Sequence, residues 1–274
     1  MTSNFKIRAS SFGSLFDCAY KFEGIHLLGM RYPSSARAHL GTSIHHGTAV
    51  FDSAKIFNTS DEPVTAMDAC NEFLRVIRHP EYDVAWRGAD IGQTEAERIG
   101  LTLVNRYCQE VSPNYDFLAV EMTTVPLVID CGNGVTVTLT GSLDRARIAR
   151  RHGGGIGISD IKTGKTASKD GVAKTKGHKA QLGTYELLFE HSTGGEYPIT
   201  EPAEIIGLST GKTPDVGTGL VHNAKDLLLG DDRNPGYIKL ASEIFRTGLF
   251  TPNPQSGLCS KQYCPRYMSC CYHD

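Results

Sequence analysis

Three stretches decide the fold expected for this 274-residue sequence: GSLDR at 141–145, ISDIKTG at 158–164 and QLGTYELLF at 181–189. Apolar and β-branched residues surround the first two stretches, so we predict that both are strands. The third stretch opens a run in which apolar residues recur with helical spacing. Two acidic strands followed by a polar helix predict an α/β chain whose sheet carries charged side chains.

Asp144 and Asp160 are the acidic residues of these two strands. A hard divalent cation such as Mg²⁺ prefers oxygen ligands and usually takes only one or two protein carboxylates, which leaves room for water and for substrate phosphate oxygens. Because side chains alternate along a strand, Asp160 and Lys162 share one face, while the carbonyl of Ile161 is a further oxygen ligand. The pattern predicts a Mg²⁺ or Mn²⁺ site.

Lys162 and the helical pair Gln181 and Tyr185 add catalytic groups to this site. A metal ion lowers the pKa of its bound water, and a nearby ammonium group orients that water or stabilises the charge of the transition state. Gln181 and Tyr185 are four residues apart, so they share a helix face and can hold a phosphate or a base against the metal. Alone, an Asp-x-Lys pair is more often a screened surface pair.

The succession Gly-x-x-Asp, Asp-x-Lys and Gln-x-x-x-Tyr resembles the PD-(D/E)XK nuclease superfamily over most of the chain. Within it, the sequence is similar to the RecB-like branch, which includes AddB-type and CRISPR-associated exonucleases. The resemblance implies a restriction-endonuclease-like fold, in which helices flank a mixed central sheet. It also implies metal-dependent hydrolysis of phosphodiester bonds.

Two other residues fit this resemblance. GTSIH at 41–45 resembles the Gly-x-x-x-His helix of the family, which implies that His45 binds the metal from the opposite side of the site. A histidine in such a helix is usually a core or surface residue, and the neighbouring His46 leaves the register open. Glu121 resembles the glutamate on the strand before the first metal aspartate, although an exposed strand carboxylate is the more common role.

Four cysteines near the two ends of the chain resemble the ligands of the [4Fe-4S] members of this branch. Cys18 precedes a C-terminal trio of Cys259, Cys264 and Cys270. Thiolates are the ligands that such clusters need, and the resemblance implies that the cluster joins the N- and C-terminal segments. Four residues separate the first two cysteines of the trio instead of the usual two, and Cys271 competes with Cys270 as the fourth ligand. A zinc ion held by four thiolates is the alternative.

The rest of the sequence gives no sign of secretion or membrane insertion. Residues 1–8 are polar and mixed rather than an apolar leader, and no apolar run approaches the roughly 20 residues that cross a bilayer. We therefore expect a cytoplasmic protein of a bacterium or an archaeon, or of a phage- or virus-infected cell, without disulfides. Cys70, Cys108 and Cys131 lie in apolar contexts and read as buried thiols.

Positive charge is concentrated near the acidic motifs, although the net charge is −2. Six lysines fall between 162 and 179 against one acidic residue, and we expect the Gly-, Ser-, Thr- and Lys-rich segment 165–179 to be a mobile loop that orders over DNA. Charge runs are otherwise usually solvated surface. The residues expected to contact DNA are Arg145, Lys165, Lys169, Lys174 and Lys176.

The chain reads as one domain, 1–274, with a mainly helical part at 1–112, a catalytic sheet core at 113–212 and a C-terminal helix with a cysteine-rich tail at 213–274. Gly132-Asn133-Gly134 signals a hairpin between the first two predicted strands. We predict helices at 10–28, 36–57, 64–79, 94–110 and 237–247, another from Gln181, and strands at 117–129, 135–148, 156–162 and 203–208.

These patterns together predict a Mg²⁺- or Mn²⁺-dependent deoxyribonuclease, an exonuclease acting on single-stranded or unwound DNA in recombination, repair or phage DNA processing. Neither Gly-Lys-Thr segment has the preceding glycine of a phosphate-binding loop, so a helicase or recombination partner would be a separate chain. The competing interpretation is a non-catalytic DNA-binding module stabilised by an iron-sulfur or zinc cluster.

Overall fold

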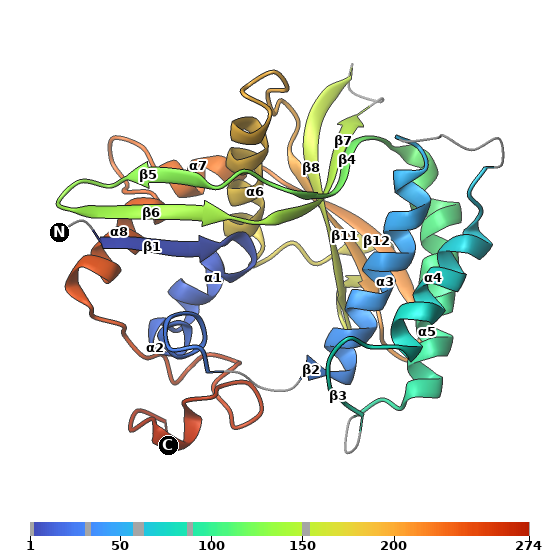
Figure 1. Ribbon diagram of the computed structural model, residues 1–274, viewed down its shortest axis with the longest axis horizontal. Coiled ribbons are helices and arrows are strands. Elements are labelled where there is room, and N and C mark those ends of the chain that lie inside the picture. The colour runs from blue at the N-terminus through green and yellow to red at the C-terminus, as the bar shows by residue number, and fades with distance from the viewer. Residues whose placement is uncertain (1–2, 31–33, 57–62, 87–89, 150–153, 274) are drawn as a thin grey trace.

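The structure is a computed structural model that describes residues 3–30, 34–56, 63–86, 90–149 and 154–273. Its largest sheet has seven strands, mixed in direction, with helices on both faces (Figure 1). This confirms the predicted mixed α/β architecture. In spatial order the strands are β4 (Asp116–Thr123), β7 (Ser142–Ala149), β8 (Gly155–Gly164), β11 (Ala203–Ser209), β12 (Asp215–Val221), β10 (Val172–Ala173) and β9 (Ser168–Lys169).

Strand β8 lies in the middle of this sheet and carries the Asp-x-Lys motif. It pairs antiparallel with β7, where Arg145 lies opposite Ser159, and parallel with β11, where Ile205 lies opposite Asp160. Asp144 on β7 and Asp160 on β8 therefore belong to adjacent strands. The strand order alone brings the two acidic motifs together.

A second sheet of three strands consists of β1 (Ser3–Arg8), β6 (Val135–Thr140) and β5 (Leu127–Asp130), in the order β1-β6-β5. The expected hairpin at 132–134 joins β5 to β6, and all three of its residues have positive φ, which suits Gly-Asn-Gly. Strand β1 was not expected. It pairs in parallel with β6, more than a hundred residues away.

The predicted continuous strand at 135–148 is wrong, because Gly141 divides it into β6 and β7, which belong to different sheets. A Cβ at Gly141 would lie 2.9 Å from the ring of Tyr185 and 3.3 Å from the Cβ of Ala9. Glycine lets the chain pass between these side chains on its way from one sheet to the other. The predicted strand at 117–129 is likewise divided into β4 and β5.

Helices cover both faces of the large sheet (Figure 1). One face packs against α1 (Ala9–Asp17) and α6 (Lys179–Ser192), and the other against α3 (Ala36–Ser53), α4 (Ala66–Arg78) and α5 (Gln93–Arg106). The Ser35 hydroxyl caps α3, and Thr65 and Asp68 form a capping box on α4. Two short strands, β2 (Ser34–Ser35) and β3 (Val84–Ala85), pair with each other. The remaining helical segments are α2 (Ala19–Phe22), η1 (Glu23–Leu27), η2 (Tyr107–Val111), η3 (Ser112–Asn114), α7 (Ala224–Leu229), α8 (Tyr237–Thr247) and η5 (Tyr267–Ser269).

The central strands are buried on both faces. On β8 and β11, Ile161 and Ile206 face the core formed with α3, α4 and α5, whereas Ile158 and Ile205 face the core formed with α6. Charged side chains on strands of this kind lose contact with water and need partners. Asp160 on β8 therefore cannot be an ordinary surface carboxylate.

The C-terminal tail packs against the N-terminal helices. Asn253 Nδ2 donates to Asp17 O over 2.8 Å, the Ser256 hydroxyl donates to Asp17 Oδ2 over 2.6 Å, and the Arg266 guanidinium stacks 3.4 Å from the centre of the Tyr20 ring. The two ends of the chain thus form one small substructure below the three-stranded sheet (Figure 1). The metal cluster expected there is considered below.

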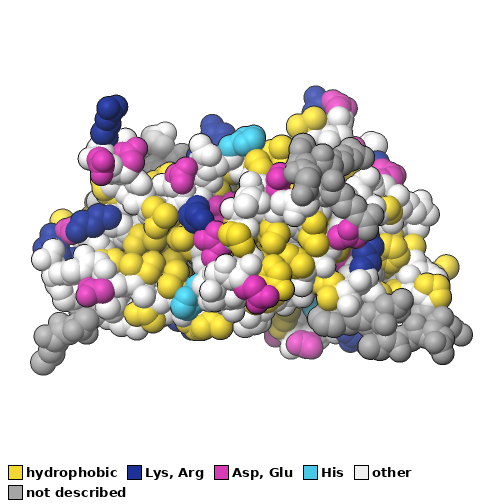
Figure 2. All heavy atoms as spheres, turned by 90° about the horizontal axis from the view of Figure 1, so that it is seen from above, with side chains coloured by type: hydrophobic (Ala, Val, Ile, Leu, Met, Phe, Trp, Pro, Cys, Tyr) yellow, Lys and Arg dark blue, Asp and Glu magenta, His cyan; other side chains and the backbone are white. Residues whose placement is uncertain are grey.

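Charged side chains of both signs are interspersed with apolar ones on the face shown in Figure 2, without a broad field of one sign. None of the described helices combines the length and the apolar character needed to cross a bilayer.

Candidate metal centre

A cleft of about 650 Å³ lies where α3 meets β8 and the start of α6. Its lining includes small and polar residues along one side of α3, which leaves the charged groups of the sheet accessible. The charged and amide side chains that line it, together with the two histidines, are His45, His46, Glu121, Asp144, Asp160, Lys162 and Gln181.

His45, Glu121 and Asp144 form the tightest group of potential metal ligands among the described residues, with one donor atom of each within 4.8 Å of the others. His45 Nδ1 lies 3.7 Å from Asp144 Oδ2 and 3.8 Å from Glu121 Oε1. Burial lowers the pKa of His45, but Asp144 and Glu121 together raise it by more than burial lowers it. The net shift of the pKa is therefore upward. One imidazole nitrogen and two carboxylates suit a divalent cation.

Glu121 reaches this group through an unusual backbone conformation. Its φ is +48° within β4, in the left-handed region that residues other than glycine rarely adopt. Arg145 Nη1 holds Glu121 Oε1 at 2.9 Å. Burial raises the pKa of Glu121, but His45 and Arg145 lower it more. From the sequence, an exposed strand carboxylate was the more common role expected of Glu121, whereas the structure places its carboxylate beside His45 and Asp144.

Asp160 and Lys162 occupy the floor of the cleft. Lys162 Nζ lies 2.6 Å from Asp160 Oδ2, yet that oxygen has no hydrogen bond of good geometry within the described residues. Burial, and then the charge of Asp144, raise the pKa of Asp160 to about 6. A buried carboxylate that lies beside other acidic groups fits a cation ligand, because a bound cation offsets the clustered negative charge.

Gln181 and Tyr185 both point from α6 toward Asp160, but only Gln181 lines the cleft. Gln181 Nε2 donates to Asp160 Oδ1 and to the Tyr185 hydroxyl, each over 3.1 Å. Tyr185 is buried, and this burial, followed by the charges of Asp160 and Asp144, raises its pKa. Of the expected pair, Gln181 therefore contacts the cleft directly, and Tyr185 fixes the Gln181 amide through a hydrogen bond.

Ile161 contributes its backbone to the centre. Its N–H donates to Asp144 Oδ2 over 2.7 Å and fixes the carboxylate across the two strands, while its side chain belongs to the core against α3. The residue also lines the cleft. The carbonyl contact itself stays a prediction.

The expectation that Arg145 contacts DNA is wrong. Its side chain is fully buried, with Nε 2.6 Å from Asp52 Oδ2, Nη1 2.7 Å from the carbonyl of Asp144 and Nη2 3.1 Å from Thr48 Oγ1. The sequence shows a basic residue beside Asp144 but not the face of the strand to which it points. From the buried side of the site, Arg145 donates hydrogen bonds to the Glu121 carboxylate and to the Asp144 carbonyl.

Asp52 is the partner that the sequence analysis missed. It also accepts hydrogen bonds of 2.5 Å from the hydroxyls of Tyr107 and Ser112, so its carboxylate is satisfied entirely by buried donors. An aspartate within an apolar helical stretch, seven residues after His45, is the signal that could have drawn attention to it. The helix that provides His45 thus also anchors Arg145.

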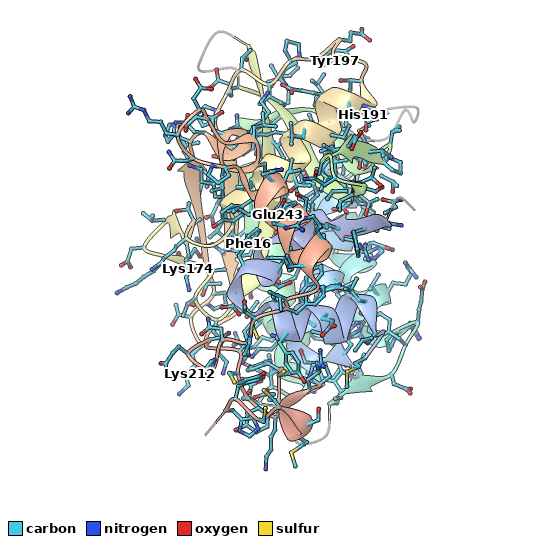
Figure 3. All side chains as sticks on the ribbon, turned by 90° about the vertical axis from the view of Figure 1, so that its left-hand side faces the viewer. Phe16, Lys174, His191, Tyr197, Lys212 and Glu243 are labelled. Carbon is cyan, nitrogen blue, oxygen red and sulfur yellow. The ribbon has the colours of Figure 1, made fainter. Side chains whose placement is uncertain are left out.

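The predicted DNA-contacting lysines are exposed and lie on or next to a short hairpin. Strands β9 and β10 pair antiparallel around 170–171, so part of the segment expected to be a mobile loop is regular structure. Lys174 extends away from the surface in Figure 3. Lys165, Lys169, Lys174 and Lys176 are all exposed.

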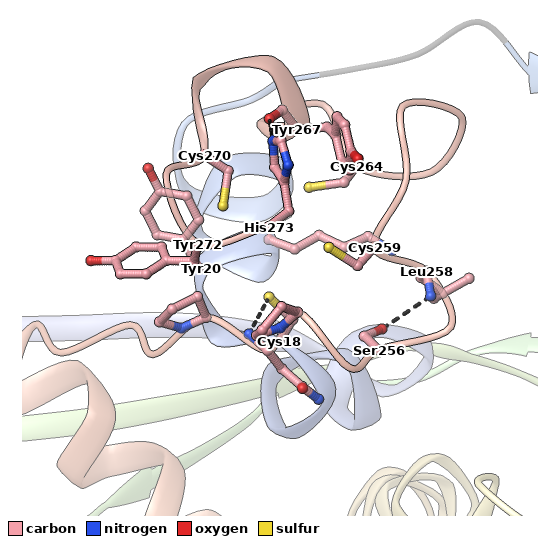
Figure 4. A pocket seen from close by; sticks show the side chains of 14 residues that line it. Cys18, Tyr20, Ser256, Leu258, Cys259, Cys264, Tyr267, Cys270, Tyr272 and His273 are labelled. Atoms are coloured by element: carbon pink, nitrogen blue, oxygen red, sulfur yellow. Dashed lines mark hydrogen bonds between the residues drawn. The ribbon is translucent and has the colours of Figure 1, made fainter.

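The four cysteines expected to bind a cluster line one pocket between the N-terminal helices and the tail (Figure 4). Cys18, Cys259, Cys264 and Cys270 contribute to its wall, whereas Cys271 is exposed and does not. The backbone N–H of Asn253 points at the Cys18 sulfur over 3.4 Å. Burial, and then the charges of the three other cysteines, raise the pKa of Cys259.

These four thiols do not form a group as compact as the one around His45 in the described residues. Four sulfurs around one zinc ion lie about 3.8 Å apart, since each zinc–sulfur bond is about 2.3 Å long. A cluster of several irons spaces its thiolates more widely. The pocket fits a thiolate-ligated group, but a bound cluster that joins the termini is not shown. All eight cysteines are described, and none forms a disulfide.

No protein-family model and no curated protein matches the sequence. Among solved structures, the chain is similar to the crystal structure of SSO0001, with 15% identity, a TM-score of 0.37 and coverage of 94% of this chain and 95% of that one. It is also similar to a "putative exonuclease" from Eubacterium rectale, with 12% identity, a TM-score of 0.43 and coverage of 89% and 78%. Likenesses this weak carry no argument about function, which must come from the geometry of the site.

Proposed function

We propose that this protein is a Mg²⁺- or Mn²⁺-dependent deoxyribonuclease of the RecB-like PD-(D/E)XK type. The observation that carries the proposal is the convergence of His45, Glu121 and Asp144 beside the buried carboxylate of Asp160, in a cleft that also contains Lys162. Carboxylates, an imidazole and an ammonium group are the functional groups that metal-assisted phosphodiester hydrolysis needs.

His45, Asp144 and Asp160 would hold the ion, with Glu121 as a further acidic ligand. A bound divalent cation supplies charge neutralisation of the phosphate and a lowered pKa for attacking water. Lys162, fixed beside Asp160, orients the nucleophile and stabilises negative charge on the phosphate. Gln181, fixed by Tyr185, positions the strand at the edge of the cleft.

We further propose that the substrate is single-stranded or unwound DNA and that cleavage is exonucleolytic. The exposed lysines around the β9–β10 hairpin support this proposal, since they provide positive charge next to an acidic centre that would otherwise repel the phosphates. A helicase or recombination partner and a cytoplasmic location remain predictions from the sequence.

For the thiol pocket we propose a [4Fe-4S] cluster held by Cys18, Cys259, Cys264 and Cys270, with zinc as the alternative. The support is the shared pocket and the mutual electrostatic influence of the thiols. A group bound there would tie the tail to the N-terminal helices. Loop-closure entropy makes such a long-range link stabilising.

The competing interpretation, a DNA-binding module without catalysis, explains the site less well. Burial of Asp160 next to Asp144 costs free energy, and a platform that only binds an anionic polymer gains nothing from clustered carboxylates. That cost is understandable if a cation binds there.

The test is incubation of end-labelled single- and double-stranded DNA with Mg²⁺, Mn²⁺ or EDTA, with products resolved on a gel. We expect metal-dependent shortening from an end, and a loss of at least about 100-fold in Asp160→Asn, because this change removes a ligand charge at nearly constant shape. Asp170→Asn is the matched control, since Asp170 is exposed and its positive φ suits asparagine. Binding without cleavage by the parent protein, or full activity of Asp160→Asn, would contradict the proposal.

A further inference from the structure

Two basic residues share one carboxylate near the N-terminal end of α3. Arg37 Nε lies 3.0 Å and 2.9 Å from the two carboxylate oxygens of Asp90, and Lys165 Nζ forms an ion pair with the same carboxylate. The side chains of Lys165 and Asp90 are 56% and 49% exposed, so solvent reaches the contact. Hydrogen bonds from Lys165 and then Arg37 lower the pKa of Asp90, which is therefore ionised at neutral pH.

Arg37 is held in place without the help of Asp90. Its Nη1 donates to the carbonyl and to the hydroxyl of Thr210, over 3.1 Å and 3.2 Å. Thr210 is buried, and its own N–H donates to the carbonyl of Gly164 at the end of β8 over 2.8 Å. The guanidinium is thus anchored from the protein side, while Asp90 approaches it from the solvent side.

The same two elements carry this cation pair and the candidate metal centre. Arg37, Gly41 and His45 are spaced by four along α3 and lie on one side of the helix, about 12 Å from first to last. Lys165 lies three residues after Lys162 and is the first residue beyond the end of β8. Gly41, which lies between Arg37 and His45 in sequence, and Thr163, which lies between Lys162 and Lys165, both line the cleft. A strand that reaches the metal centre along this side of α3 passes the cation pair.

We propose that Lys165 and Arg37, the latter anchored by Thr210, form a subsite for a backbone phosphate of the DNA strand, and that Asp90 occupies this subsite when no DNA is bound. Arg37 Nε donates to both oxygens of the Asp90 carboxylate, and the oxygens of a phosphate accept charge-assisted hydrogen bonds from a guanidinium in the same way. An exposed carboxylate is held weakly, so a phosphate of the strand displaces it. The subsite rests on the proposed function, because it requires a DNA strand in this cleft.

The proposal gives Asp90 and its partners opposite effects on DNA binding. In EDTA, which excludes cleavage, we expect Asp90→Asn to lower the Kd of a fluorescein-labelled oligothymidylate by about 3-fold or more, since the competing charge is gone. Arg37→Met combined with Lys165→Met should raise the Kd by at least about 10-fold and flatten its salt dependence. Fluorescence anisotropy measures both effects, and thermal unfolding checks that each variant is folded.

Asp232→Asn is the matched control, because it removes the same charge from an exposed site. Binding by Asp90→Asn no tighter than by Asp232→Asn, or unchanged binding by the double variant, would overturn the subsite. A protein that shows the expected order of affinities but never cleaves DNA refutes the proposed function and leaves the subsite standing. A protein that cleaves DNA while Asp90→Asn is neutral refutes only the subsite, and a parent protein that binds no DNA refutes both.

Discussion

Arg145 illustrates how a single side chain can support a charged site without touching its substrate. Its guanidinium is fully buried and links Asp52 on α3, Glu121 on β4 and the backbone of Asp144 on β7. Three elements that carry candidate metal ligands are therefore held by one cation. Removing that cation would leave the buried carboxylate of Asp52 with the hydroxyls of Tyr107 and Ser112 as its remaining partners.

We expect Arg145→Met to lower the free energy of unfolding by about 3 kcal/mol or more, because breaking a buried pair leaves an uncompensated charge. Asp52→Asn in the same chain should restore part of the loss, since it removes that charge. Urea unfolding of the two single variants and the double variant measures the coupling. A stable Arg145→Met protein whose only defect is weak DNA binding would reinstate the DNA contact expected from the sequence.

Glu186 on α6 gives the protein a pH-dependent term in its stability. Burial is the main reason that its pKa rises to about 7, although the N–H of Lys225 donates to its carboxylate over 2.9 Å. Between the ordinary pKa of glutamate and pH 7 the folded chain keeps a proton that the unfolded chain has lost. Stability contributed by this residue therefore falls as the pH rises through that window.

Glu186→Gln should remove this term, because glutamine keeps an oxygen for the Lys225 N–H and never ionises. We expect the variant to be more stable than the parent by on the order of 2 kcal/mol at pH 8 and similar to it near pH 4. Denaturant unfolding across this pH range measures the difference. Glu243→Gln is the control, because the Glu243 side chain is 38% exposed, and an equal gain from both variants would show that burial of Glu186 is not the cause.

At the scale of elements, the sequence predicted helices better than strands. The helix at 237–247 has the predicted bounds, because its apolar spacing is strong and glycines flank both ends. Strand β1 was missed because its mixed sequence becomes a strand only by pairing with β6. The break at Gly141 was missed because it depends on contacts with Tyr185 and Ala9, which are remote in sequence.

Gly41 sets the distance between α3 and β8. A Cβ at this position would lie 2.5 Å from Thr163 Oγ1 but 3.6 Å from Thr163 Cβ. We expect Gly41→Ala to move α3, and His45 with it, away from the acidic residues, and to lower metal-dependent cleavage by about 10-fold or more, as small misplacements of catalytic groups do. Thr163→Ala removes the clashing oxygen, so it should restore activity in the double variant.

Activity assays with thermal unfolding separate a shift of the helix from a loss of fold. Gly13→Ala in α1 is the matched control, because the added Cβ would meet only an ordinary contact at 3.7 Å. If Thr163→Ala fails to rescue Gly41→Ala, the close approach of α3 to β8 is not what the glycine provides.

At the scale of the whole molecule, most residues of the candidate site could be named from the sequence, but the residues that support them could not. Asp160, Lys162, Gln181 and Tyr185 could be named because their spacings of two and four stay within single elements. The position of Glu121 beside His45 and Asp144 was not readable, since it depends on a left-handed residue within a strand. The role of Arg145 was misassigned, because the face of β7 to which it points depends on tertiary packing.

The thiol pocket gives a prediction about the stability of the entire chain, since it brings the two ends together. If a metal group is bound there, Cys264→Ala should lower the Tm by about 5 °C or more and reduce solubility and activity. Cys271→Ala is the matched control, because Cys271 does not line the pocket.

Metal analysis and the visible spectrum identify the group. We expect a brown protein that contains iron and bleaches on reduction. A colourless protein with one zinc ion would replace the iron-sulfur proposal with the zinc alternative. A stable, fully active and colourless Cys264→Ala variant would remove the structural role.

The most direct test of the whole account is a crystal structure of the protein grown with Mn²⁺, with anomalous scattering used to locate the ion. We expect a peak bound by His45, Asp144 and Asp160 with Glu121 alongside, and its loss in Asp144→Asn. Mn²⁺ bound elsewhere while this cleft holds no anomalous peak would contradict the claim that these side chains form a metal centre.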